Sequence, residues 1–223
     1  MKISYIMPVY NGQNNISKAV KSLLNQNVKG EIIVINDGST DNTKRILDYF
    51  SEEINIINLD TRKGAAYCRN LGNWESKGDI IAVCDCDIYY KERGEAIKEF
   101  FKKEKKDVFY SALHCRSADD PNKKWQQAAY AWDFKSKCPI SHPTVAYRRL
   151  VAMECPYHEE TIHSDLFEFC LLDMNTNKFE FGGCQNPLMM KIEGFKNRDM
   201  KESRKIKKKK YEDYGIKVEY EDE

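Results

Sequence analysis

The first ninety residues alternate between short apolar runs and stretches in which apolar residues recur every three or four positions. The runs are rich in β-branched residues and predict buried strands from Ile3 to Pro8, at 31–35, near 54–59 and at 79–84. The spaced apolar residues predict helices between these strands. Strand and helix in regular alternation favour an α/β fold with a mostly parallel sheet and helices on both faces.

Turn-forming residues mark the starts of the predicted helices. Asn14 or Asn15 can cap the helix that follows the first strand. After the second strand, Asn36–Gly38 forms a turn, and Ser39 or Thr40 is expected to start the next helix. The elements of the first half are therefore short and closely connected.

The second half of the chain has a less regular pattern. Residues 92–104 predict an amphipathic, lysine-rich helix, and residues 108–113 predict a strand. Residues 124–134 place Trp125 and Trp132 on one face of a predicted helix. An aromatic stripe at this spacing usually packs in the core.

Composition indicates one domain without a strong overall electric field. A chain of 223 residues can bury one sizeable core, and its 36 Lys and Arg residues nearly balance 35 Asp and Glu residues. No run of eighteen apolar residues could span a bilayer, and a strand that begins at Ile3 leaves no room for a signal peptide. We expect a cytoplasmic protein whose eight cysteines, which show no zinc-type pair of CxxC motifs, are reduced thiols.

Two aspartates follow the predicted strand at 79–84, and they are the most informative residues of the chain. The end of a strand is where an open α/β sheet binds ligands. In an extended strand, Asp85 and Asp87 would point to one side, and their like charges would need a cation or hydrogen bonds to compensate them. Carboxylates suit hard divalent ions such as Mg²⁺ and Mn²⁺, which in turn can bind the phosphates of a nucleotide.

Four sequence blocks, in their order and spacing, resemble family 2 glycosyltransferases. The blocks are Pro8-Val9-Tyr10-Asn11, Asn36-Asp37-Gly38-Ser39-Thr40-Asp41, Gly64 with Arg69-Asn70-x-Gly72, and Asp85-x-Asp87. The resemblance implies a GT-A-like nucleotide-binding fold and transfer of a sugar from a nucleotide donor with inversion at the anomeric carbon. It implies a domain at 1–200, with a nucleotide-sugar-binding half at 1–90 and an acceptor and catalytic half at 91–200. Residues 91–223 resemble the family only in patches, and 201–223 form a charged tail.

The resemblance also implies how the first half binds the base and the ribose. The loop from Pro8 to Asn11 would lie along both groups, with Tyr10 stacking on the base and the backbone of Val9 and Tyr10 supplying hydrogen bonds. The family usually has two acidic residues in the second block, one of which recognises the base. Asp37 takes that role here, with Asn36 as the alternative.

A second group of residues would bind the diphosphate and the metal. Gly64 would allow close backbone approach beside Lys63, and Arg69 would approach the diphosphate. Asp87 would bind Mn²⁺ or Mg²⁺ directly, while Asp85 reaches the ribose, or the metal through water. The complete donor set is Pro8, Val9, Tyr10, Asn11, Asn36, Asp37, Lys63, Gly64, Arg69 and Asp85.

Three further residues are candidates from the second half. Many family members complete the metal site with a histidine, and alignment on the following glycine places Glu193 there; the alternative is an ordinary surface glutamate. Asp165 matches the family's catalytic base, although Ser164 replaces the acid that usually precedes it. The alternative is that Ser164 caps a helix and Asp165 only interacts with its dipole. Trp132 could be a platform for the acceptor sugar or a core residue.

These residues favour an inverting glycosyltransferase that uses a UDP-sugar, with a glycan, a lipid-linked sugar or another hydroxyl compound as acceptor. One alternative is a non-catalytic nucleotide-sugar-binding protein, against which the three aspartates Asp85, Asp87 and Asp165 argue. Another is a protein that acts on nucleic acid through the basic segment 204–210. The balanced net charge argues against this second alternative.

Overall fold

The computed structural model describes residues 1–117, 120, 122–127, 140–160, 173–174, 176–193, 209 and 212, with only the backbone for 192 and 193. The first half contains β1 (Ile3–Val9), α1 (Ile16–Leu24), β2 (Glu31–Asn36), α2 (Thr43–Asp48), β3 (Asn55–Asn58), α3 (Ala65–Glu75) and β4 (Ile80–Val83). The second half adds β5 (Ile88–Tyr89), α4 (Arg93–Lys103), β6 (Val108–Ser117), β7 (Lys124–Gln127), the 3-10 helix η1 (His142–Thr144), β8 (Ala146–Arg148), α5 (Arg149–Glu154) and β9 (Phe181–Glu193). No helix in this described part of the chain combines the length and the apolar character that crossing a membrane requires.

The described strands form one sheet in the order β3-β2-β1-β4-β8-β6-β9-β5, with β7 paired to β6. β1 is parallel to its neighbours β2 and β4, and β2 is parallel to β3, which confirms the parallel sheet predicted for the first half. β8 runs antiparallel to both β4 and β6. β9 is parallel to β6 and antiparallel to β5, so the second half of the sheet is mixed.

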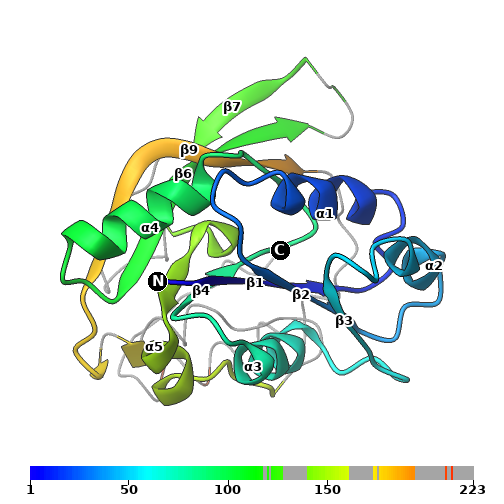
Figure 1. Ribbon diagram of the computed structural model, residues 1–223, viewed down its shortest axis with the longest axis horizontal. Helices are drawn as coiled ribbons and strands as arrows, with labels where there is room; N and C mark the ends of the chain where they lie inside the picture. The colour runs from blue at the N-terminus through cyan, green and yellow to red at the C-terminus, as the bar shows by residue number, and fades with distance from the viewer. Residues whose placement is uncertain are drawn as a thin grey trace.

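Side chains of the central strands alternate between two cores, one on each face of the sheet. On β1, Tyr5 and Met7 join the cluster that packs against α1, α2 and α4, whereas Ile6 joins the cluster against α3 and α5. Figure 1 shows these two groups of helices on opposite sides of the sheet. Because successive side chains of a strand point to opposite faces, a strand covered on both sides needs apolar residues at nearly every position. This requirement explains the continuous apolar runs in the sequence.

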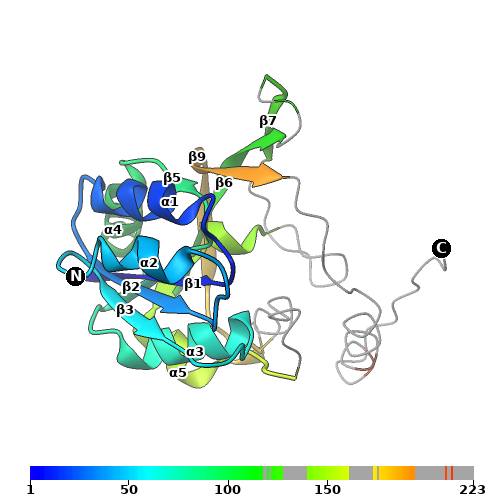
Figure 2. The same ribbon diagram turned by 90° about the vertical axis from the view of Figure 1, so that its right-hand side faces the viewer.

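The helix predicted around residues 124–134 is wrong in the part that the structure describes. Residues 124–127 form β7, which pairs antiparallel with β6 from Leu113 to Arg116. Figure 2 shows this hairpin standing away from the body of the molecule. Backbone pairing with β6 outweighs the helical spacing of the aromatic residues, because a short segment gains more from a ladder than from an isolated helical turn. Trp125 is 39% exposed and therefore does not pack in the core.

The second helix begins later than predicted, at Thr43 rather than at Ser39 or Thr40. The hydroxyl oxygen of Ser39 accepts the backbone N–H of Asn11 at 3.0 Å, and the Thr40 N–H donates to Asn11 Oδ1 at 2.8 Å. These residues join the loop after β1 to the loop after β2. The Thr40 hydroxyl also donates to Asn11 Oδ1, at 3.4 Å. The side chains of Ser39 and Thr40 therefore bond the neighbouring loop instead of capping a helix.

Arg93, at the start of α4, is fully buried and connects β4 with the segment before β8. Its Nη2 donates to the carbonyl oxygens of Val83 at 2.8 Å, Pro143 at 3.1 Å and Val145 at 3.4 Å.

Arg93→Met should lower the free energy of unfolding by about 2–4 kcal/mol, because buried carbonyls lose a charged donor. Urea denaturation measures this loss. Lys102→Met, at an exposed position of the same helix, is the control and should stay within about 0.5 kcal/mol of the wild type; equal stability of the two variants would contradict the role of Arg93.

Candidate active site

The loops that carry the sequence blocks meet at the carboxyl ends of β1, β2 and β4. Val9 lies opposite Asn36 in the sheet, and the Asp37 N–H donates to the Val9 carbonyl at 2.8 Å. The carboxyl edge of parallel strands is where α/β proteins bind ligands. The first half of the chain therefore gathers its predicted donor-binding residues at one edge of the sheet.

Asp37 is buried and holds the loop before α3. Its Oδ1 accepts the backbone N–H of Lys63 at 2.6 Å, and its Oδ2 accepts that of Gly64 at 3.0 Å. Gly64 has φ of 98°, a conformation that favours glycine. The structure thus brings together three residues that the sequence predicts for donor binding. Each carboxylate oxygen has a second lone pair, so Asp37 retains capacity to accept a bond from a ligand.

The two asparagines of the donor set take part in local structure. Asn36 Nδ2 donates to Asn58 Oδ1 on β3 at 2.8 Å. Asn11 has φ of 49°, and its side chain accepts the N–H of Thr40. Both side chains therefore hold the loops around the site in place, which makes Asp37 the better candidate for recognising a base.

Tyr10, directly after β1, is 40% exposed, and Arg62 lies across its ring. The Arg62 guanidinium carbon is 4.3 Å from the ring centroid, a distance typical of a cation–π contact. Sequence reasoning missed Arg62. Its position directly before Lys63 and Gly64 is the one signal that could have identified it.

Arg69 and Asp85 form an ion pair at the same edge. Arg69 Nη2 lies 2.6 Å from Asp85 Oδ1; the arginine is buried, whereas the aspartate side chain is 37% exposed. The cation that compensates the aspartate charge in this structure is therefore a guanidinium from α3. Charge-assisted bonds of this kind are among the stronger hydrogen bonds in proteins.

The two aspartates do not lie in an extended strand, as their spacing had predicted. β4 ends at Val83, and the Asp87 N–H turns back to the Asp85 carbonyl at 2.8 Å. β5 begins at Ile88, directly after this turn. From β5, the Tyr89 hydroxyl accepts the Asp85 N–H at 2.6 Å. Burial raises the pKa of the Tyr89 hydroxyl well above its usual range, so this group stays protonated.

The carboxylate oxygens of the two aspartates suit a divalent cation. Asp85 and Asp87 offer carboxylate oxygens from one turn, and Mg²⁺ is commonly bound by one or two carboxylates together with substrate phosphates and water. In the described part of the chain, no three His, Cys, Asp or Glu side chains come together as a metal cluster. Burial, together with the neighbouring charges of Asp87 and Asp85, raises the pKa of the Cys86 thiol to about 12, so this thiol is protonated at neutral pH.

The structure places only part of the predicted catalytic half. Asp165 and Trp132 lie outside the described residues, as does the side chain of Glu193. The backbone of Glu193 lies opposite Ser117 in the sheet. The roles of these residues remain predictions.

Tyr157 and His142 lie beside the ion pair, and the sequence did not identify either. The Arg69 guanidinium carbon is 5.7 Å from the Tyr157 ring centroid, and the Tyr157 hydroxyl lies 2.9 Å from His142 Nε2. Neither residue lies in one of the four sequence blocks, so proximity in the fold is what reveals them.

A sequence profile of the family described as Glycosyl transferase family 2 matches residues 4–158, well over half of the chain. The chain belongs to glycosyl transferase family 2. An uncharacterized glycosyltransferase from Rickettsia bellii is 30% identical over 154 residues, which are 65% of this chain and 22% of that protein. An Escherichia coli relative, named UDP-Glc:alpha-D-GlcNAc-diphosphoundecaprenol beta-1,3-glucosyltransferase WfgD, is 36% identical over 87 residues, 38% of this chain and 34% of that protein. The family 2 chain thus spans about a third or less of the length of these relatives.

Solved structures of similar fold include complexes with UDP or a UDP-sugar. TarS 1–349 from S. aureus, in complex with UDP-GlcNAc, has a TM-score of 0.72 at 20% identity, over 89% of this chain and 60% of that one. Glucosyl-3-phosphoglycerate synthase from Mycobacterium tuberculosis, in complex with Mn²⁺, UDP and glucosyl-3-phosphoglycerate, has a TM-score of 0.68 at 15% identity, over 97% of this chain and 81% of that one. These likenesses confirm the GT-A fold of the family 2 chain.

Proposed function

We propose that this chain transfers a sugar, with inversion, from a UDP-sugar to the hydroxyl group of an acceptor. The observation that carries the proposal is the meeting of the Asp85–Asp87 turn with Arg69 at the edge where Asp37 and Tyr10 also lie. Together these residues offer a stacking surface, hydrogen-bond acceptors, a cation and carboxylates. A nucleoside diphosphate needs groups of these four kinds.

Each part of the donor has a candidate partner. Tyr10 stacks on the base, Asp37 accepts a bond from the base or ribose, and Lys63 and Arg69 balance the diphosphate charge. Asp87 and Asp85 would hold Mn²⁺ or Mg²⁺, with Glu193 as a candidate third ligand. When bound, such an ion supplies positive charge to the diphosphate as the nucleotide leaves. The Mn²⁺ and UDP in glucosyl-3-phosphoglycerate synthase support this assignment.

Transfer also needs a base for the acceptor. Asp165 would take the proton of the acceptor hydroxyl while its oxygen attacks the anomeric carbon opposite the departing diphosphate. Trp132 would be a platform for the acceptor sugar. The name of the E. coli relative describes a lipid-linked sugar diphosphate acceptor, which supports a glycan or lipid-linked sugar as the acceptor class.

Nucleotide binding can be tested without knowing the acceptor. We expect UDP at 100 times its Kd, with MnCl₂, to stabilise the protein by about 2.7 kcal/mol. For a chain of this size that corresponds to a rise in Tm of roughly 5–10 °C. Differential scanning fluorimetry with UDP, GDP, ADP and CDP, each with MnCl₂ or with EDTA, measures it.

Each result separates one part of the proposal from the others. Stabilisation by GDP instead of UDP would contradict the choice of nucleotide. Equal stabilisation by UDP in EDTA would contradict the role of the cation. NMR of the product formed from the stabilising nucleotide's sugars then tests inversion, since retention of the anomeric configuration would exclude direct in-line attack.

A further inference from the structure

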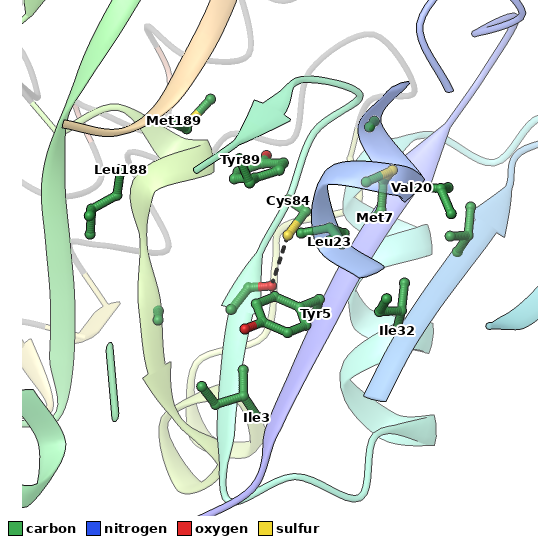
Figure 3. Packing of buried hydrophobic residues seen from close by; sticks show 14 of the residues in the cluster. Ile3, Tyr5, Met7, Val20, Leu23, Ile32, Cys84, Tyr89, Leu188 and Met189 are labelled. Atoms are coloured by element: carbon green, nitrogen blue, oxygen red, sulfur yellow. Dashed lines mark hydrogen bonds between the residues drawn. The ribbon is translucent and has the colours of Figure 1, made fainter. Parts of the chain in front are cut away.

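The hydroxyl group of Tyr89 binds both backbone groups of Asp85. It accepts the Asp85 N–H at 2.6 Å and donates to the Asp85 carbonyl oxygen at 3.3 Å. The ring itself is only 3% exposed and belongs to the core cluster under α1 and α4. Figure 3 shows the Tyr89 ring beside Cys84 in this core. A core side chain therefore reaches out to the turn that carries the aspartates.

Together with other contacts, these bonds hold both the backbone and the side chain of Asp85 in place. Its carbonyl oxygen also accepts the Asp87 N–H at 2.8 Å, and its carboxylate is bound by Arg69 at 2.6 Å. Backbone and side chain of the first aspartate are thus both held, from the core and from α3. Because Asp87 is bonded to the Asp85 carbonyl, the position of the second aspartate depends on the first.

Tyr89 is itself held from three sides. The Arg93 guanidinium carbon lies 4.6 Å from its ring centroid, and Arg93 also donates to the carbonyl of Val83 at the end of β4. The Tyr89 N–H donates to the Ser22 hydroxyl of α1 at 3.1 Å, and Tyr89 pairs with Met189 of β9. The hydroxyl is therefore a fixed point to which the turn is attached, not a group that follows the turn.

We propose that Tyr89 is a positioning residue for the divalent cation of the donor site. It acts through Asp85, whose backbone it holds, and through the Asp85 carbonyl it also fixes the turn that carries Asp87. Mg²⁺ and Mn²⁺ sites tolerate little displacement of their ligands, and groups that orient a ligand typically contribute 10–100-fold to metal affinity. The inference rests on the proposed metal-bound donor site.

The test is the Mn²⁺ affinity of Tyr89→Phe in the presence of saturating UDP, measured by electron paramagnetic resonance titration of MnCl₂. The substitution keeps the buried ring and removes only the hydroxyl. We expect Mn²⁺ to bind about 10–100-fold more weakly than to the wild type. The affinity for uridine, which has no phosphate and needs no cation, should change less than about twofold. Tyr5→Phe is the matched control, because Tyr5 is equally buried and its hydroxyl donates instead to the Val28 carbonyl.

The outcomes are distinguishable. Wild-type Mn²⁺ affinity in Tyr89→Phe would overturn the inference while leaving the proposed function intact. A parallel loss of uridine affinity would also overturn it, since the hydroxyl would then support the fold in general. Absence of Mn²⁺ binding in the wild type and in Tyr5→Phe, with UDP present, would remove the proposed metal site and this inference with it.

Discussion

Replacing Asp165 with asparagine is expected to lower the rate constant of sugar transfer by about 10²–10⁴-fold, the usual contribution of a positioned general base. Asparagine is nearly isosteric with aspartate but cannot take up the proton of the acceptor hydroxyl. Donor binding should not change, because the residues proposed for the nucleotide lie in the first half of the chain. Steady-state transfer assays and UDP titration by calorimetry measure the two quantities.

Glu168→Gln is the matched control, three residues further along the same segment. It should keep near-normal transfer if Asp165 is the base. Normal transfer by the Asp165 variant together with a large loss in the Glu168 variant would assign the base to Glu168. Loss of UDP binding in Asp165→Asn would indicate a damaged fold and would contradict a purely catalytic role.

The first half of the fold could be predicted because its physical requirements are local. β1, β2 and β4 are covered on both faces, so each must be apolar at almost every position, and Ile32–Ile35 on β2 send successive side chains into two different cores. The turn residues at Asn36–Gly38 occur where the strand has to end. A single sequence contains this information in full.

Other elements depended on contacts that no local pattern records. Ser39 and Thr40 have the chemistry of helix caps, but their hydrogen bonds go to Asn11, twenty-eight and twenty-nine residues away. β7 is a strand because β6 offers it a partner. The spacing of Trp125 and its neighbours contains no sign of that partner.

The site shows the same division between local and tertiary information. The family blocks predict Arg69 and Asp85 as donor-site residues, but they contain no sign of the ion pair that joins this helix residue to a turn after a strand. Tyr89 and Arg93 lie next to each other in the core and support the aspartate turn. In the sequence, Tyr89 carries no sign of a site residue, and Arg93 reads as an ordinary part of the lysine-rich helix.

Asp87→Asn is expected to weaken UDP binding in the presence of MnCl₂ by about 100-fold or more. Changes to groups that merely orient a ligand already lower metal affinity by 10–100-fold, and the loss of a charged ligand should lower it further. Asp87 is only 9% exposed, so an isosteric amide disturbs the packing less than alanine would. Calorimetric titration of UDP into each protein, with MnCl₂ or with EDTA, measures the effect.

Asp85→Asn should affect UDP affinity differently from Asp87→Asn, because Asp85 forms an ion pair with Arg69. Because Arg69 already pairs with one Asp85 oxygen, this variant loses a smaller share of the charge available to the cation, and it releases a guanidinium for the diphosphate. Its loss of UDP affinity in MnCl₂ should therefore be smaller than that of Asp87→Asn, and its affinity in EDTA should rise above the wild-type value. Asp79→Asn, at an exposed side chain before β4, should match the wild type in both conditions. Equal losses in Asp85→Asn and Asp87→Asn would show that the two carboxylates serve the cation alike, and wild-type affinity in Asp87→Asn would exclude Asp87 as a ligand.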